Sequence, residues 1–162
     1  VIFPVSENEK YINANLAIKQ LYLRYSLIGN ILAELKTTLD RMDVGLSFEN
    51  GLNSMSVTGD ISHLSGTPTL NLDAVVDINA LQRFEQLSLG YFSQMKGKIN
   101  GRIKVKGTTE KPEVKGFIAF DETSFKVNSL NFLAKISNEK VLLDEQGIRC
   151  FMENSRWMQM YS

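Results

Sequence analysis

The sequence predicts a mainly β protein: an elongated, curled sheet, antiparallel or mixed, with an apolar trough and one or two short helices. Two observations predict this fold. Apolar and polar residues alternate over most of the chain, which is the period of a strand with one face toward water. A pattern also recurs, because residues 44–61 align without a gap on residues 101–118 at a constant offset (101 − 44 = 57). Repetition at a long fixed period is typical of extended arrays rather than of catalytic globules.

The residues that agree across the repeat are mostly apolar, together with one glycine. Leu46 aligns with Ile103, and Gly59 aligns with Gly116, whereas the polar residues between them differ freely. Each unit is a strand, a polar turn and a second strand. The repeated feature is therefore an apolar face and a bend, which indicates a functional surface rather than a pocket.

Strands are expected wherever the alternation persists, and turns rich in Gly, Asn and Pro separate them. The first strand places Ile12 and Leu16 on one face and Asn13 on the other. Further strands are expected around residues 44–48, 57–61, 70–78, 98–106, 113–121, 125–127, 130–136 and 141–143. The phase of the alternation changes after Val127, which predicts a β-bulge near residues 128–129.

Two segments break the period-two pattern and predict short helices near residues 26–39 and 79–89. In the first segment, apolar residues recur four positions apart, at Leu27, Ile31, Leu35 and Leu39. The second segment follows Asn79, a residue type suited to a helix N-cap. Each predicted helix lies shortly before one of the repeated strand pairs.

The charge balance and the lone cysteine exclude several classes of function. Eighteen basic and eighteen acidic residues cancel, so the chain has no overall attraction to nucleic acid, and we expect no nucleic-acid partner. No apolar run approaches the roughly 20 residues of a membrane-spanning helix. Cys150 is the only cysteine, which excludes an internal disulfide.

The sequence carries no motif for catalysis, metal binding or cofactor binding. His63 is the only histidine and aligns with Phe120 in the repeat, so we expect it to be structural or half-buried. Asp73 and Asp77 share the polar face of a strand, where solvation explains them better than acid–base chemistry does. We therefore assign no catalytic residue, no metal ligand and no cofactor, and predict that the protein is not an enzyme.

A basic stripe follows one strand face, formed by Lys98, Arg102, Lys104 and Lys106. No aromatic residue is interleaved with it, as stacking on nucleic acid would require. Lysines also protect strands against pairing with other chains. We interpret the stripe as a solvated face, with an anionic headgroup or an acidic partner as the alternative.

The apolar face is the more informative surface, because its residues form one continuous lining if the strands pair in chain order. The predicted lining residues are Leu46, Phe48, Val57, Ile61, Leu70, Leu72, Val76, Ile99, Ile103, Val105, Val114, Ile118, Phe120, Phe125, Val127 and Phe132. Such a face is either the core of a closed sandwich or an open trough for an apolar ligand. Two short helices are too few to cover so large a sheet, which favours the trough.

The segment from 93 to 149 resembles the C-terminal region of TamB-type translocation and assembly proteins, in the AsmA-like superfamily. Residues 97–108 read GKINGRIKVKGT and residues 111–120 read KPEVKGFIAF. The pattern continues through segments 124–127, 130–132, 138–141 and 144–148. Residues 44–92 resemble the same family more loosely, through segment 64–68 and the alternating strand that follows it.

The resemblance implies an envelope protein of a diderm bacterium, located in the periplasm and anchored in the inner membrane by a helix. Proteins of this family have β-taco-like sheets that curl into an apolar groove, and they move phospholipid toward the outer membrane. The implied partner is therefore phospholipid. A second implied role is a scaffold that assists an Omp85-type barrel in outer-membrane protein assembly and protein secretion. The family members are not enzymes.

The sequence divides at two points. Residues 1–92 are a β-rich segment containing both predicted helices, and residues 93–149 are the TamB-like β segment. Residues 150–162 lose the alternation, which we interpret as a frameshifted or truncated tail. The missing anchor helix and the initial Val1 fit an internal fragment of a longer protein.

Overall fold

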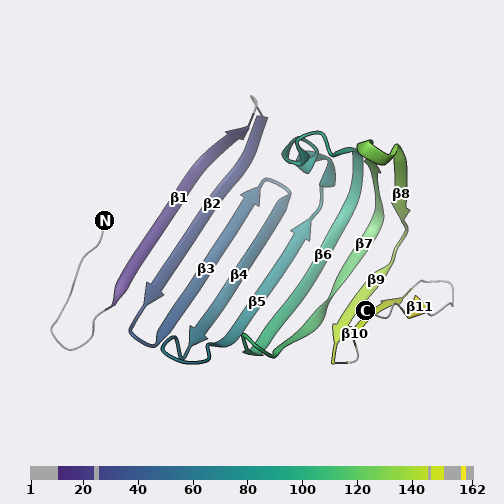
Figure 1. Ribbon diagram of the computed structural model, residues 1–162. Coiled ribbons are helices and arrows are strands. Elements are labelled where there is room, and N and C mark those ends of the chain that lie inside the picture. Colours follow the sequence, from purple (N-terminus) through teal and green to yellow (C-terminus); the bar gives the residue numbers. More distant parts are fainter. Residues whose placement is uncertain (1–10, 24–25, 146, 152–157, 160–162) are drawn as a thin grey trace.

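A computed structural model describes residues 11–23, 26–145, 147–151 and 158–159, which form one antiparallel sheet of 11 strands (Figure 1). The strands are β1 (Ile12–Leu23), β2 (Ser26–Thr37), β3 (Arg41–Asn50), β4 (Asn53–Ser62), β5 (Thr69–Ile78), β6 (Phe92–Thr108), β7 (Pro112–Val127), β8 (Phe132–Ile136), β9 (Lys140–Asp144), β10 (Gly147–Phe151) and β11 (Met158–Gln159). Three short 3-10 turns complete the described elements: η1 (Leu81–Phe84), η2 (Gln86–Ser88) and η3 (Asn128–Leu130). The prediction of a mainly β fold with an elongated, curled sheet is confirmed.

The sheet is a meander in which each strand from β1 to β7 pairs with the next strand along the chain. Strands β8 and β9 then both pair with β7, on successive parts of its length, so that they share one position in the sheet. Strands β10 and β11 follow β9 in order. All these pairings are antiparallel, so the described sheet is antiparallel rather than mixed. It is open, with β1 at one edge.

The predicted helix near residues 26–39 is wrong, because this segment forms strand β2. β2 pairs along its length with β1 and β3. A spacing of four residues is a multiple of the strand period as well as close to one helical turn. Ile31 and Leu35 therefore lie on one face of a strand as readily as on one face of a helix. The neighbouring strands decide between the two structures.

The predicted helix near residues 79–89 is present only as the two 3-10 turns η1 and η2. Asn79 does not cap them; its side chain instead donates hydrogen bonds to the Leu52 carbonyl (3.1 Å) and to Asp77 (2.9 Å). Leu89 ends η2 in a left-handed conformation with φ 51°. Residues 79–91 form a compact connection between β5 and β6, called here the cap segment.

The change of phase near the end of β7 occurs earlier than predicted. The register between β6 and β7 shifts between the pairs Ser93–Lys126 and Lys98–Asp121, and Glu122 has a positive φ of 42°. Residues 128–129 lie in η3, which turns the chain from β7 into β8. The irregularity is therefore a bulge inside β7, followed by a turn.

The sheet runs continuously through the expected boundary between residues 92 and 93, because β6 begins at Phe92 and pairs with β5. The strand pattern also extends into the expected tail. Cys150 lies in β10 opposite Val141, and β11 pairs with β10. Residues 152–157 and 160–162 of that tail lie outside the described residues.

The two repeated units are the hairpins β3–β4 and β6–β7, and their registers differ by two residues. Leu46 pairs with Val57 in the first hairpin, whereas Val105 pairs with Val114 in the second. The second turn is two residues longer, from Gly107 to Pro112. A shift of two is one full strand period, so every repeated side chain keeps its face.

The glycine shared by the two units is required by its backbone. Gly59 and Gly116 have φ values of 144° and 155°, which L side chains rarely adopt. A Cβ atom on Gly59 would overlap the carbonyl oxygen of Asn71, and one on Gly116 would overlap that of Arg102. In both hairpins the glycine thus allows the neighbouring strand to approach closely.

The substitutions Gly59→Ala and Gly116→Ala should each lower the free energy of unfolding by about 1–3 kcal/mol, through backbone strain and this overlap. Gly66→Ala is the matched control, because a Cβ atom there would have no neighbour within 4 Å and the φ of Gly66 is ordinary. We expect Gly66→Ala to be neutral or stabilising by up to about 1 kcal/mol. Urea unfolding measures all three; equal effects at all three positions would contradict the assignment.

Very little of the sheet is buried. Among the described residues, the buried hydrophobic side chains are Ile28, Ile78, Ala80 and Leu81. Ala80 and Leu81 lie in the cap segment, and Ile78 is the strand residue that precedes it. The core is therefore confined to one end of the strands, and no second layer covers the described sheet. This excludes the closed sandwich as the explanation of the alternation.

Candidate functional site

The register of the strands places their apolar positions on one continuous side of the sheet, called here the apolar face. Ile78 lies opposite Ile99, and Leu72 lies opposite Val105. The same alignment carries through every pairing from β1 to β10. Other residues on this face are Ile12, Leu16, Ile18, Ile31, Leu35, Met42, Val44, Met55, Ala74, Val141, Leu143, Ile148 and Cys150.

The predicted lining residues from Leu46 to Phe120 all lie on the apolar face. The last three predicted residues lie beyond the bulge in β7. Val127 pairs with Phe92 on one side and with Phe132 on the other. The Phe125 ring meets the Phe92 ring edge-on, with centroids 5.6 Å apart. Phe125, Val127 and Phe132 thus form an apolar extension of the face at one end of the strands.

None of the predicted lining residues is buried. Leu46 is 45% exposed and Phe132 is 57% exposed, and the others are half-buried or exposed. Neighbouring strands alone account for such partial burial. The face is consequently accessible to a ligand along the described sheet.

Sequence reasoning misses several members of this face, for two reasons. Ile31 and Leu35 fall in a segment predicted to be a helix, although their spacing also fits a strand. Val141, Leu143 and Ile148 lie in short strands whose position beside β7 depends on contacts distant in sequence. The alternation in the first strand is evident from the sequence. The register of β1 with β2 places the apolar residues of β1 on the apolar face.

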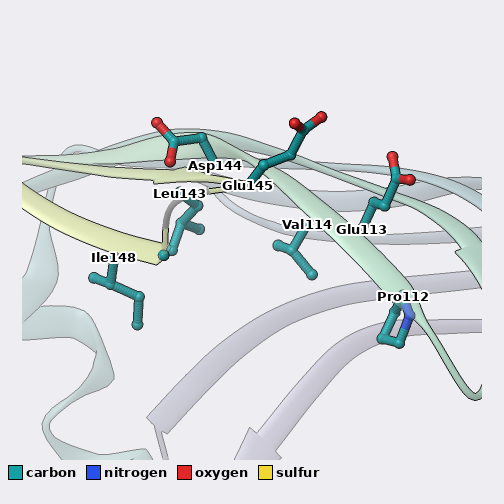
Figure 2. A pocket seen from close by; sticks show the side chains of 8 residues that line it. Pro112, Glu113, Val114, Leu143, Asp144, Glu145 and Ile148 are labelled. Atoms are coloured by element: carbon teal, nitrogen blue, oxygen red, sulfur yellow. The ribbon is translucent and has the colours of Figure 1, made fainter. Parts of the chain in front are cut away.

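A hollow lies at the β10 side of the face, with a volume of about 550 Å³. Figure 2 shows its two-sided wall: Val114, Leu143 and Ile148 point to one side of the sheet, while the Glu113 and Glu145 carboxylates point to the other. The volume is within the range of sites for small ligands. The same strands thus carry apolar side chains on one side and carboxylates on the other.

The cap segment packs over one end of the apolar face. Phe84 of η1 contacts Phe48 of β3, with ring centroids 5.7 Å apart. Arg83 donates a hydrogen bond from Nη1 to Oδ1 of Asn50 (3.1 Å). The backbone N–H of Met95 donates to the Glu85 carboxylate (3.2 Å). Aromatic and polar contacts together hold the segment to β3 and β6.

Asn53 is the central attachment of the cap segment. It is 1% exposed, and its Oδ1 accepts hydrogen bonds from the N–H groups of Asn79 (3.0 Å) and Ala80 (2.8 Å). Its Nδ2 donates to the Ala80 carbonyl (3.2 Å). One buried amide thereby satisfies three backbone groups of an irregular segment.

The opposite face of the sheet is polar and carries the basic stripe. Asp73 lies between Arg102 Nε (3.5 Å) and Lys104 Nζ (3.6 Å), and Lys98 Nζ lies 3.3 Å from Asp121. Cross-strand carboxylates therefore neutralise much of the stripe. This arrangement agrees with its interpretation as a solvated face.

A further ion pair on this polar face joins β7 to the turn after β9. Lys115 Nζ lies 2.5 Å from Glu145 Oε1. The hydrogen bond and the opposite charge lower the pKa of Glu145 and raise the pKa of Lys115. Both side chains are exposed, so the pair is screened by salt and adds little to stability.

The remaining sequence-selected groups do not assemble into a reactive site in the described part of the chain. His63 is exposed in the turn between β4 and β5, with φ 59°, so the half-buried position expected for it is wrong. No three His, Cys, Asp or Glu side chains of the described residues lie close enough to hold a metal ion. Asp77 accepts a hydrogen bond from Asn79 and lies on the polar face.

No helix in the described ranges is both long and apolar enough to cross a bilayer. In comparisons with known proteins, no family model matches the chain, and no curated protein or solved structure matches it.

Asn53→Ala should release the cap segment while leaving the sheet paired. Each backbone N–H left buried without a partner costs about 1–3 kcal/mol, and hydrogen exchange at residues 79–91 should accelerate accordingly. Asn71→Ala is the matched control, because it removes an exposed hydrogen bond to Asp60 and should cost less than about 1 kcal/mol. Unchanged protection of residues 79–91 in Asn53→Ala would contradict the role given to Asn53.

Proposed function

We propose that this chain is a periplasmic segment of an envelope bridge that binds and conducts phospholipid acyl chains between the inner and outer membranes. The observation that carries the proposal is the apolar face, which is continuous over the described sheet and has no covering layer. A soluble domain does not ordinarily leave so large an apolar surface without an occupant. The resemblance of residues 93–149 to TamB-type proteins supports the same function.

The mechanism of binding would be hydrophobic burial without a specific site. Each methylene group transferred from water to the apolar face contributes about 0.8 kcal/mol. The side chains of the face are mainly branched aliphatic groups with few polar atoms, so one position along the face binds an acyl chain much as the next does. Uniform binding favours movement, since no single position holds the lipid strongly. The charged headgroup would stay in water beyond the strand ends.

Ile103 and Lys104 provide a direct test, because adjacent residues of β6 lie on opposite faces. A photoreactive amino acid at position 103 should capture phospholipid in cells, and the same group at position 104 should not. The control keeps the strand, the position along the strand and the chemistry of the probe nearly constant, and changes only the face on which the probe lies. Capture at neither position, or equal capture at both, would contradict conduction along this face.

Ile118 and Ala119 allow the matched substitution experiment in β7. Ile118→Asp places a carboxylate on the apolar face and should weaken phospholipid binding about tenfold or more, through lost apolar contact and burial of a charge. Ala119→Asp places the same group on the polar face opposite Lys140, where it should leave binding unchanged. Quenching of a fluorescent phospholipid reports binding, and circular dichroism checks the fold of both variants.

A second candidate function is that of a scaffold for outer-membrane protein assembly with an Omp85-type barrel. It is favoured by β8, which pairs with β7 alone among the described strands and so leaves one edge open. An exposed edge can accept a strand from a partner. A crosslinker at Lys135 should then capture protein rather than lipid; capture of lipid alone would exclude this role for β8.

A further inference from the structure

The two ends of the strands differ in what lies over the apolar face. At the upper end in Figure 1, the cap segment lies beside the ends of β4, β5 and β6. Phe48, Asn53 and Ile78 belong to the apolar side of their strands by register. Asn53 and Ile78 are buried, and Phe84 of the cap segment lies against Phe48. The cap segment therefore closes this end of the face.

The opposite end of the face has no such cover in the part of the chain that the structure describes. Leu70, near the start of β5, pairs with Ile61 of β4 on one side and with Gly107 of β6 on the other. None of these three residues is buried. The apolar face is therefore closed at one end of the strands and open at the other.

Polar turns border the open end. Leu39 is the one large apolar side chain that these turns expose. Hydrogen bonds link them to one another: the Leu64 N–H donates to the Asp40 carbonyl (3.3 Å), and the Thr109 N–H donates to the Pro68 carbonyl (3.0 Å). The turns, which carry mainly hydroxyl, imidazole and charged side chains, are residues 38–40, 63–68 and 109–111.

The open part of the face matches one acyl chain in length. Along β5 it runs from Val76, the first apolar-face residue after the buried Ile78, to Leu70, which is six residues away (76 − 70 = 6). Strands rise about 3.4 Å per residue, so this distance is about 20 Å. A bilayer has a hydrocarbon core about 30 Å thick, which gives each acyl chain about 15 Å. One chain laid along β5 thus fits between the cap segment and the polar turns, and two chains end to end do not.

We infer that a phospholipid on this face lies along the strands, with the ends of its acyl chains against the cap segment and its headgroup at the polar turns. The reverse orientation would place the headgroup against Phe48 and Phe84, where it would lose hydration without gaining partners. The amide oxygens of Asn50 and Asn53 at that end already accept hydrogen bonds from the cap segment. Lipid movement would then run across the strands at constant orientation. The inference rests on the proposed function and adds which strand ends the headgroup occupies.

Fluorescence quenching in the full chain tests this orientation. The only tryptophan, Trp157, is replaced by phenylalanine, and a single new tryptophan is introduced by Val76→Trp beside the cap segment or by Leu70→Trp at the open end. The probes are phosphatidylcholines with a nitroxide either near the terminal methyl or near the headgroup end of an acyl chain. The methyl-end nitroxide should quench Val76→Trp more strongly than Leu70→Trp. The ratio of the two quenching constants should invert with the headgroup-end nitroxide.

Met55→Trp and Ile61→Trp repeat the comparison on β4, because Met55 pairs with Val76 and Ile61 pairs with Leu70. This second pair keeps the test decisive if circular dichroism shows that a β5 variant does not fold. Val75→Trp is the matched control on the polar face, and neither probe should quench it. Equal quenching at both ends, or the reverse order, would overturn the inference and leave acyl binding intact. Absence of quenching at every apolar-face position would overturn the proposed function as well.

Discussion

Hydrogen bonding between neighbouring antiparallel strands holds this sheet together. The described chain buries few hydrophobic side chains, and those lie mainly at the cap segment. Elsewhere the strands are held by their backbone ladders and by contacts between adjacent side chains on each face. A sheet stabilised in this way can leave an entire face uncovered, which a domain built around a closed core cannot do.

The open face explains where specific packing is needed. Gly59 and Gly116 let strands approach closely in the two repeated hairpins. At the end of the face, Asn53 satisfies the backbone of the cap segment, and Phe48 packs against Phe84. On the polar face, carboxylates such as Asp73 lie between basic side chains. Of these devices, only the cap segment covers part of the apolar side, at one end of the strands.

Much of this architecture can be predicted from sequence, because strand alternation fixes which residues share a face. A shift of two residues in the register between paired strands leaves those faces unchanged. The lining residues from Leu46 to Phe120 are predictable for that reason. Strand β2 is not predictable in this way, since apolar residues spaced four positions apart suit a helix and a strand equally. The attachment of residues 79–91 by Asn53 depends on contacts between residues 26 or 27 positions apart, which no local pattern contains. Alternation is also the same in a closed sandwich and in an open sheet, so only the assembled strands distinguish the two.

We propose that the apolar face is open in the folded chain and is occupied by acyl chains. Native mass spectrometry of the chain, purified from bacterial envelopes without detergent, tests this occupancy. We predict a monomer that carries phospholipid, released when the collision energy is raised. A lipid-free monomer, or a lipid-free dimer that protects the apolar face from labelling, would contradict the claim.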